Sequence, residues 1–387
     1  MCIRDSTRAI PSLLIDLDKL DQNITTLKTN WPATANFRIV VKSLPSWELI
    51  QYVMNQTESK KLMVFHQPFL SDLVEKLDGH ADILLGKPMP IKTATYFYQN
   101  LPEIKQGFNS FLQIQWLVDT TQRIKEYIDL AKKLNQKLRL NLEIDVGLHR
   151  GGFNSLASLK AGLQLLMDNK EWVTFSGLMG YDPHVVKLPK IIRTQEKALN
   201  LANDFYTACK ALIQQEFSDL WSADLTFNGA GSPTIQLHQK ESPLNDISAG
   251  SCLVKPTTFD LPTLANYEPS SYIASPILKA FQGTTLPALE GMKSVLNFIS
   301  SSNQQSFYIY GGFWKADYCY PKGIKQNDLF ISTNQTMLNA PTAVNLAVDD
   351  FVFLRPHQSE FVFLQFGNIL PIRAGKLEAA WGILKNY

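Results

Sequence analysis

The stretch IQWLVDTTQRIKEYIDLAKKLNQKLRLNLEID, residues 114–145, contains one complete unit of the pattern that decides the fold. Its two ends, residues 114–118 and 138–145, are short runs rich in apolar residues, and such runs favour buried strands. A helix is expected between them behind Thr120, a residue type that caps helices, because apolar residues recur there at helical spacing: Ile124, Ile128, Ala131 and Leu134. A helix between two such strands is typical of the crossover that joins parallel strands.

The same alternation of strand-like runs and helix-compatible segments extends from Phe37 to Gly250. A later segment repeats the helical spacing at Leu201, Phe205, Ala208 and Leu212. Eight strands separated by helices within about 250 residues predict an α/β fold, the (β/α)8 or TIM barrel, and the competing interpretation is an open doubly wound sheet. The eight expected strands are Phe37–Lys42, Leu62–Phe65, Asp82–Leu85, Ile114–Val118, Leu138–Asp145, Val173–Met179, Asp224–Asn228 and Asp246–Gly250.

The residues at the C-terminal ends of these strands favour the barrel, because barrel enzymes place their chemistry at that end. Those positions hold Lys42, His66, Gly86, Asp119, Asp145, Tyr181, the Asn228–Ser232 loop and Gly250.

The two ends of the chain differ from the barrel pattern. Residues 12–16 read as a strand, and the next residues form one helical face: Leu17, Leu20, Ile24 and Leu27. After about Phe259 the helical pattern stops, and strand-favouring runs follow at residues 307–310, 329–331, 351–354 and 361–364. We therefore expect a barrel over residues 12–258 and a mostly-β domain over residues 259–387 that also packs near the N-terminal strand. The repeated FVFL in FVFLRPHQSEFVFL is either a hairpin or a coincidence of composition.

Composition narrows the class of protein. Hydrophobic residues make up 45% of the chain and charged residues 19%, which is typical of a folded globular protein. The formal net charge is +2 and no basic run stands out, so nucleic acid is not an expected partner. We find no apolar run of ~20 residues and no signal peptide, and therefore expect a soluble, cytoplasmic protein without a membrane partner. The four cysteines form no CxxC pair, so free thiols are expected.

Lys42 ends the first strand in FRIVVKSLPS, after a largely apolar run. A lysine that loses its hydration also loses its proton readily, and this is the property that a Schiff-base lysine needs. The alternative is a lysine whose ammonium group reaches solvent at the end of the strand. The local sequence leaves both interpretations open.

NGAGSPT, residues 228–234, follows the seventh strand, and its small residues let an anion approach the backbone N–H groups. An ordinary turn between strand and helix is the alternative. Gly250 and Ser251 close the eighth strand, and barrels build phosphate sites from the loops after strands 7 and 8. The two loops together favour a single phosphate site.

Two further segments place polar side chains beyond strands. EIDVGLHRGGF, residues 143–153, carries Asp145, His149 and Arg150, whose guanidinium suits a phenolate or carboxylate but could also pair with Asp145. GLMGYDPHV carries Tyr181 and His184, an aromatic face and an imidazole that titrates near neutral pH. The alternatives are a core tyrosine and a surface histidine.

Taken together, these segments resemble the fold-type III pyridoxal phosphate enzymes. The likeness rests on VVKS at the first strand, DVGLHRGGF at the fifth, GYDPH at the sixth, NGAGSPT at the seventh and ISAGS at the eighth. More narrowly, the set resembles the D-threonine aldolase and D-serine dehydratase branch of the alanine racemase-like group. The resemblance extends from about Pro11 to the C-terminus. It implies a barrel like the alanine racemase N-terminal domain, a C-terminal domain of the D-serine dehydratase type, and a homodimer.

The resemblance also implies a role for individual residues. Lys42 forms the internal aldimine with pyridoxal 5'-phosphate, Arg150 donates to the phenolic oxygen of the cofactor, and Tyr181 lies against the pyridine ring. The two Gly-containing loops bind the cofactor through Asn228, Gly229, Ala230, Gly231, Ser232, Gly250 and Ser251. The expected catalytic residues are Lys42, Tyr181 and His184, with His184 transferring protons.

The sequence departs from this branch near the C-terminus, where the aldolases and dehydratases usually carry a metal-binding His-x-Cys or His-x-Asp. Here RPHQSE places Ser359 two residues after His357, and a neutral serine is a poor ligand beside thiolate or carboxylate. The acidic Glu-His pair typical of the dehydratases is replaced by STNQTML, residues 332–338. We therefore predict that no tightly bound metal is needed, which favours retro-aldol cleavage slightly over dehydration.

Three functions remain open. The first is a lyase that acts on small β-hydroxy D-amino acids, by retro-aldol cleavage or by dehydration and deamination. The second is an amino-acid racemase, which needs a second base, for which Tyr318 and Tyr320 are the candidates. The third, a non-catalytic pyridoxal phosphate carrier, is disfavoured because carriers of this fold lack the whole C-terminal domain.

Overall fold

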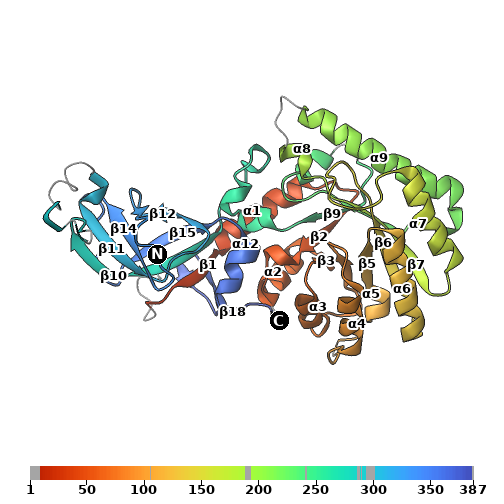
Figure 1. Cartoon of the computed structure of the whole chain (residues 1–387), viewed down its shortest axis with the longest axis horizontal. Helices are drawn as coiled ribbons and strands as arrows, with labels where there is room; N and C mark the ends of the chain where they lie inside the picture. The colour runs from red at the N-terminus through yellow and green to blue at the C-terminus, as the bar shows by residue number, and fades with distance from the viewer. Residues whose placement is uncertain are drawn as a thin grey trace. The chain divides into compact units, whose positions relative to one another are not determined.

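A computed structural model describes residues 9–104, 106–187, 193–239, 242–285, 288, 290–292 and 301–385 (Figure 1). Eight parallel strands close into a barrel in the order β2 to β9. The expected barrel is therefore confirmed, and the open doubly wound sheet is wrong. The barrel strands are β2 (Asn36–Val40), β3 (Lys61–Val64), β4 (Asp82–Leu85), β5 (Ile114–Val118), β6 (Leu138–Glu143), β7 (Val173–Gly180), β8 (Thr226–Gly229) and β9 (Asp246–Ala249).

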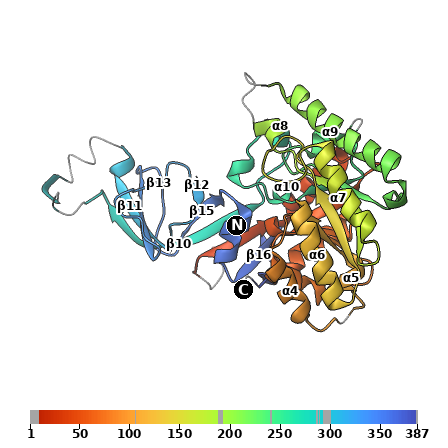
Figure 2. The same ribbon diagram turned by 45° about the vertical axis from the view of Figure 1, so that its right-hand side comes forward.

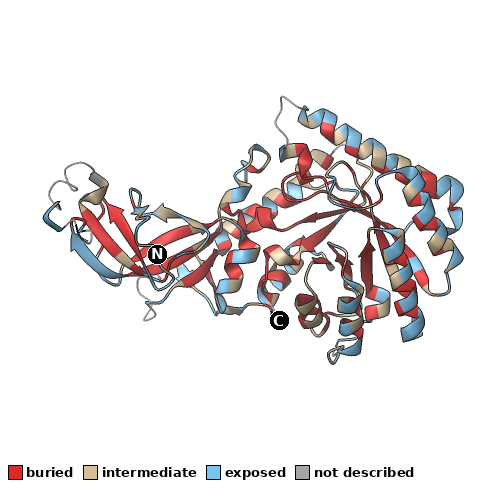
Figure 3. Ribbon diagram, in the orientation of Figure 1, coloured by how far each residue is buried: buried red, intermediate tan, exposed pale blue. Residues whose placement is uncertain are grey.

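Helices follow the barrel strands and cover the outside of the barrel (Figures 1 and 2). Their inner faces are buried and their outer faces are exposed (Figure 3). The helices described in and around the barrel are α1 (Leu17–Asn30), α2 (Trp47–Thr57), α3 (Gln67–Val74), α4 (Ile91–Gln99), α5 (Ser110–Gln113), α6 (Thr121–Leu134), α7 (Leu156–Asp168), α8 (His184–Lys187), α9 (Gln195–Glu216) and α10 (Ser251–Val254).

Two of these helices test the expected apolar faces. Helix α6 begins as predicted, because the Thr120 side chain accepts a hydrogen bond from the backbone N–H of Arg123. In α9 the expected apolar face is wrong, because the buried face lies about one residue further along the chain. Leu201 is 45% exposed, whereas the buried side chains of α9 are Ala198, Ala202, Tyr206, Cys209, Leu212 and Ile213.

The interior of the barrel contains a buried polar network near the N-terminal ends of the strands. The Arg38 guanidinium is fully buried, and its Nε and Nη2 donate to the two oxygens of Asp246 at 2.8 and 2.9 Å. Nη2 also donates to Asp82 at 2.7 Å. Gln115 donates to Asp82 and to Thr226, so the network connects opposite sides of the barrel. Arg38 and Asp246 are 208 residues apart in the sequence, so no local pattern predicts their pairing.

The chain forms two compact units. Of the described residues, one unit contains the barrel, within residues 24–252 and 261–266, and the other contains residues 9–23 together with those within 253–260 and 267–383. In the second unit, β1 (Ser12–Asp16) pairs antiparallel with β10 (Ser271–Gln282) and parallel with β16 (Asn368–Arg373). The other strands of this sheet are β11 (Gln305–Tyr310), β12 (Ala316–Tyr320), β13 (Lys325–Gln326), β14 (Gln335–Ala340), β15 (Phe351–Pro356), β17 (Lys376–Leu377) and β18 (Trp381–Gly382).

Two strands expected in this unit are wrong. Residues 329–331 lie in a turn, where Asn327 Oδ1 accepts a hydrogen bond from the backbone N–H of Leu329, whose side chain is 73% exposed. The second FVFL copy is helical, with α12 (Ser359–Val362) followed by a short 3-10 turn. Ser359, Val362 and Phe363 are buried there while Phe361 is exposed, which is helical rather than alternating spacing. The FVFL pair is therefore not a hairpin.

Three cysteines lie in the described part of the chain, and none is in a disulfide: Cys209, Cys252 and Cys319. Among the described residues, no helix combines the length and apolar character needed to cross a bilayer.

Candidate functional site

Lys42 lies just beyond β2, in a short 3-10 turn that spans residues 41–43. The strand ends at Val40, two residues earlier than the sequence suggested. Lys42 is half-buried, and its Nζ lies 4.7 Å from the ring centroid of Phe65, which follows β3. A Cβ on Gly86 would lie 2.2 Å from that ring, so the ring occupies the space above the glycine. The amine thus lies against an aromatic face at the C-terminal end of the barrel.

The loops after β8 and β9 meet beside this turn. Ser232 Oγ accepts hydrogen bonds from the backbone N–H groups of Gly250 at 3.2 Å and Cys252 at 3.0 Å. Ser251 Oγ lies 2.8 Å from Ser43 Oγ, next to Lys42. A Cβ on Gly250 would lie 2.7 Å from the Val40 carbonyl oxygen, so only glycine allows this close approach. The structure therefore brings the two predicted phosphate loops and the lysine turn together.

Tyr181, just beyond β7, lies against the loop after β8. A Cβ on Gly231 would lie 2.7 Å from Tyr181 Cε2, so the glycine leaves room for the ring. The loop turns sharply at Ala230, whose φ of 59° is in the left-handed region. Arg150 Cζ lies 5.3 Å from the centroid of the Tyr181 ring. Arg150, Tyr181 and the Gly231 loop are thus neighbours.

Asn228 is oriented differently from the rest of its loop. Its Nδ2 donates to Asp246 Oδ1 at 2.6 Å and to Ser248 Oγ at 2.8 Å. Its side chain therefore points into the barrel interior, and its Oδ1 is buried without a hydrogen-bond partner among the described residues.

Asp182 ties the loop after β7 to the loop after β8, a link that the sequence analysis missed. Thr234 Oγ1 donates to Asp182 Oδ1 at 2.7 Å, and His238 Nε2 lies 2.8 Å from Asp182 Oδ2. All three side chains are buried. Because Asp182 is adjacent to Tyr181, this network fixes the position of the tyrosine against the Gly231 loop. The signal in the sequence was the carboxylate inside GYDPH.

His184, the first residue of α8, is 7% exposed. Its Nδ1 is buried without a hydrogen-bond partner in the described part of the chain. A Cβ on Gly147 would lie 3.0 Å from its Nε2. Burial lowers the pKa of His184, although Asp182 and Asp145 oppose this effect. The imidazole is therefore neutral at physiological pH and can accept a proton.

Asp145 pairs with His149. The sequence leaves open an ion pair of Asp145 with Arg150 instead. Asp145 Oδ2 lies 2.9 Å from His149 Nδ1, and Oδ1 accepts from the backbone N–H groups of Gly147 and His149. Burial opposes ionisation, but these hydrogen bonds hold the pKa of Asp145 below its usual range. Asp145 therefore fixes the loop that carries Arg150.

Glu143, the last residue of β6, is a site residue that the sequence analysis missed. Burial, together with Asp119 and Asp145, raises its pKa to about 7, against the opposing charge of Arg150. The alternation LRLNLE in β6 puts Arg139, Asn141 and Glu143 on one face. That alternation was the available signal, because it places the carboxyl on the interior side of the barrel.

The residues considered for a metal or a second base lie in the other unit. His357 Nε2 lies 2.9 Å from Asp317 Oδ1, and Ser359 is 2% exposed. Burial raises the pKa of Tyr318 well above its usual value, whereas Tyr320 is 53% exposed. Within the described ranges, no three His, Cys, Asp or Glu side chains gather as metal ligands.

Comparison with known proteins defines the class. The family described as alanine racemase, N-terminal domain, matches residues 15–257. The chain belongs to this family, whose members depend on pyridoxal phosphate. The resemblance inferred from the sequence motifs is thereby confirmed. None of the curated proteins matches the sequence.

Solved structures share the fold over the whole chain. D-threonine aldolase from Filomicrobium marinum is 12% identical with a TM-score of 0.73, and the match covers 98% of each chain. D-threo-3-hydroxyaspartate dehydratase from Delftia sp. HT23 is 14% identical with a TM-score of 0.72, covering 98% of this chain and 99% of that one. Alanine racemase from Bacillus anthracis is 12% identical with a TM-score of 0.71, covering 97% and 98%. At these identities the likeness shows the fold alone.

The geometry described above fits the family's cofactor. Glycines at positions 231 and 250 let Tyr181 and the Val40 carbonyl oxygen approach the two loops closely, because a Cβ would lie 2.7 Å from each, and the loops after strands 7 and 8 are where barrels bind a phosphate. Lys42 belongs to the turn whose Ser43 contacts Ser251, and its amine lies 4.7 Å from the Phe65 ring centroid. At the start of α8, after β7, Nδ1 of His184 is a buried polar atom that has no hydrogen-bond partner among the described residues.

Proposed function

We propose that this protein is a pyridoxal phosphate-dependent enzyme that acts on small β-hydroxy D-amino acids, with Lys42 as its Schiff-base lysine. The observation that carries the proposal is the meeting of three segments: Ser232 holds the loop of Gly250, and Ser251 contacts the turn of Lys42. A phosphate site beside a lysine amine is the arrangement that this cofactor needs. A homodimer is proposed as the assembly, as in the family.

Each residue has a binding or positioning role. The backbone of residues 229–232, with Gly250 and Ser251, binds the phosphate group. Tyr181 lies against the ring of the cofactor, and Arg150, stacked 5.3 Å from that tyrosine, donates to the phenolic oxygen. When bound, pyridoxal phosphate withdraws electrons from the Cα of an amino acid.

His184 is the proposed proton-transfer residue. Its lowered pKa keeps the imidazole neutral, and its buried Nδ1 has no partner among the described residues. A neutral imidazole can take the proton of a β-hydroxyl group, which is the step that retro-aldol cleavage requires. We therefore place retro-aldol cleavage ahead of dehydration, and we propose that no tightly bound metal is needed.

The first test is spectroscopic. Purified protein should be yellow, with a visible band that borohydride abolishes, and Lys42→Ala should be colourless. The control Lys87→Ala changes an exposed lysine that also follows a barrel strand and should stay yellow. A yellow Lys42→Ala protein refutes the assignment.

The second test concerns the reaction. Incubation with D-threonine, L-threonine, D-serine and each alanine enantiomer should yield glycine and acetaldehyde from D-threonine. Keto acid with ammonia from D-serine would indicate dehydration, and an inverted enantiomer would indicate a racemase. Activity lost on chelation and restored by zinc or manganese would overturn the metal-independent mechanism.

The third test isolates the proposed base. His184→Gln should lower kcat at least about 100-fold, the usual range for general-base catalysis, while the yellow colour remains. His80→Gln changes an exposed histidine that precedes β4, at the other end of the strand from the candidate site, and is the matched control. Full activity in His184→Gln would remove the proposed base.

A further inference from the structure

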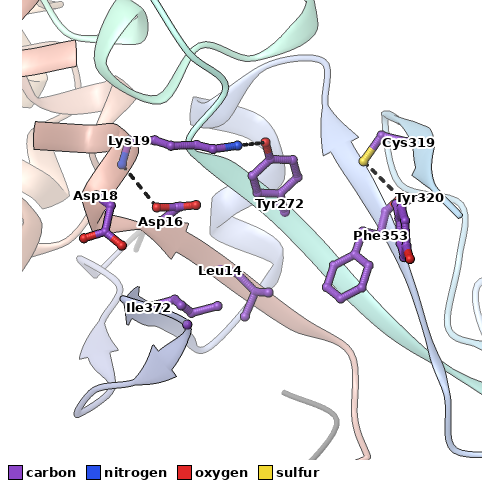
Figure 4. A pocket seen from close by; sticks show the side chains of 10 residues that line it. Leu14, Asp16, Asp18, Lys19, Tyr272, Cys319, Tyr320, Phe353 and Ile372 are labelled. Atoms are coloured by element: carbon purple, nitrogen blue, oxygen red, sulfur yellow. Dashed lines mark hydrogen bonds between the residues drawn. The ribbon is translucent and has the colours of Figure 1, made fainter. Parts of the chain in front are cut away.

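A pocket of about 440 Å³ lies in the second unit, on one face of its β-sheet (Figure 4). The described residues that line it all belong to that single unit. Leu14 of β1, Phe353 of β15 and Ile372 of β16 form an apolar floor and belong to one buried cluster. The volume falls within the ~300–1,000 Å³ of small-ligand pockets. The floor suits an aliphatic or aromatic group.

One side of this pocket carries a fixed cation. Lys19 Nζ donates to Tyr272 Oη at 3.0 Å and lies 5.3 Å from the ring centroid (Figure 4). Tyr272 Oη in turn donates to the Pro269 carbonyl oxygen at 2.9 Å, which fixes the ring. An ammonium group has three N–H donors, and within the described part of the chain Lys19 Nζ uses one of them. The other donors can bind a carboxylate.

The same wall carries an anion. Asp16 Oδ1 accepts the backbone N–H of Lys19 at 3.1 Å, so the carboxylate is held at the end of β1. Asp18 also lines the pocket, but it accepts from the backbone N–H of Ala374 at 2.7 Å. Although burial opposes it, the hydroxyl of Tyr272 and the charge of Asp16 hold the pKa of Lys19 above its usual value. Three charged residues thus line the pocket. Asp18 already accepts from Ala374 and lies 3.5 Å from Arg373 Nη1, which leaves Lys19 and Asp16 as the cation and the anion that face a ligand beside the apolar floor.

We propose that this pocket is a second ligand site, separate from the barrel site, that binds a free α-amino acid with an apolar side chain. The carboxylate of the ligand binds Lys19, its ammonium group binds Asp16, and its side chain lies on Leu14, Phe353 and Ile372. A simple carboxylic acid would leave Asp16 facing another anion, and a simple amine would leave Lys19 facing another cation. A zwitterion satisfies both charges.

Equilibrium dialysis with radiolabelled L-leucine and L-phenylalanine and their D enantiomers tests the proposal on the intact protein. We expect saturable binding that Lys19→Met weakens at least about tenfold, because a charge-assisted hydrogen bond is lost. Lys279→Met is the matched control, since Lys279 lies 5.5 Å from the Tyr308 ring in the same unit and outside the pocket. It should leave binding unchanged.

Two further measurements distinguish binding at this pocket from a folding defect and from binding at the barrel site. Leucinamide and 4-methylpentanoate, which lack one charge each, should compete with labelled leucine at least about tenfold more weakly than leucine itself. Lys42→Ala should leave this binding intact, so loss of the barrel activity and loss of this site are distinguishable.

Three outcomes would overturn the proposal. The first is no saturable binding up to about 10 mM amino acid. The second is binding that Lys42→Ala abolishes and Lys19→Met leaves unchanged, which would assign it to the barrel. The third is a dimer that Lys19→Met dissociates while no ligand binds, which would assign this face to a subunit interface.

Discussion

The substitution Arg38→Met tests whether the polar network inside the barrel stabilises the fold. Arg38 is fully buried and donates five hydrogen bonds: two to Asp246, one to the Asp82 carboxylate, and one each to the carbonyl oxygens of Leu62 and Asp82. Methionine fills much of the same volume but carries no donor. The Asp246 carboxylate, 1% exposed, would then keep Lys61 at 3.6 Å as its charged neighbour.

Removing one partner of a buried ion pair typically costs about 3–5 kcal/mol, because the other charge stays buried. We expect Arg38→Met to lower the free energy of unfolding by that amount. With an m-value of about 3 kcal/mol/M, the urea midpoint should fall by about 1–2 M. The far-UV circular dichroism signal of helices is the suitable probe, since most described helices belong to the barrel unit.

Two further variants decide the interpretation. Lys61→Met removes a half-buried lysine from the same Asp246 and should cost less than about 1 kcal/mol. The double variant Arg38→Met/Asp246→Leu removes both charges and should be more stable than the sum of the two single changes predicts. A loss below about 1 kcal/mol in Arg38→Met, or full additivity in the double variant, would refute the reasoning.

Two other predictions concern the candidate site. Gly231→Ala places a Cβ 2.7 Å from Tyr181 Cε2 and should weaken pyridoxal phosphate binding at least about tenfold in a fluorescence titration. Gly382→Ala, whose added Cβ meets nothing within 4 Å, should leave the affinity unchanged. Burial raises the pKa of Glu143 from 4.5 to about 7, so the folded protein holds this proton more tightly than the unfolded chain and stability should fall as pH rises across that window. Urea denaturation at several pH values should show that Glu143→Gln removes this fall in stability. Glu216→Gln, which changes an exposed glutamate, should retain it. An unchanged slope of unfolding free energy against pH in Glu143→Gln contradicts the assignment.

The barrel strands were predictable because each is a short apolar run bounded by turn residues. Strand β5 has the expected bounds, Ile114–Val118. Strand β2 ends earlier than expected because the backbone N–H of Leu44 bonds back to the Val41 carbonyl oxygen and forms a turn. Val41 remains apolar and buried within that turn. Composition therefore marks the buried segment, whereas local hydrogen bonds decide where the strand stops.

The two copies of FVFL show where composition fails. The first copy lies in β15 and pairs with both β10 and β12. The second copy begins within α12, whose first residue, Ser359, is buried. Identical tetrapeptides adopt a strand and a helix because partner strands flank only the first copy, and strand propensity is largely a property of that context. The expected apolar face of α9 is wrong as well, because the buried positions of this helix include the small residues Ala198 and Ala202.

The residues of the candidate site also fall into those that the sequence could predict and those that it could not. Residues that follow a strand, such as Lys42 and Ser251, could be predicted, since parallel strands bring their C-terminal ends together. The link from Asp182 to His238 spans 56 residues, and the link from Arg38 to Asp246 spans 208. No local pattern specifies which charge meets which across such separations. The period-two alternation in a barrel strand does specify which charges face inward, and a strand with several inward polar residues therefore predicts a partner network before the partners are known.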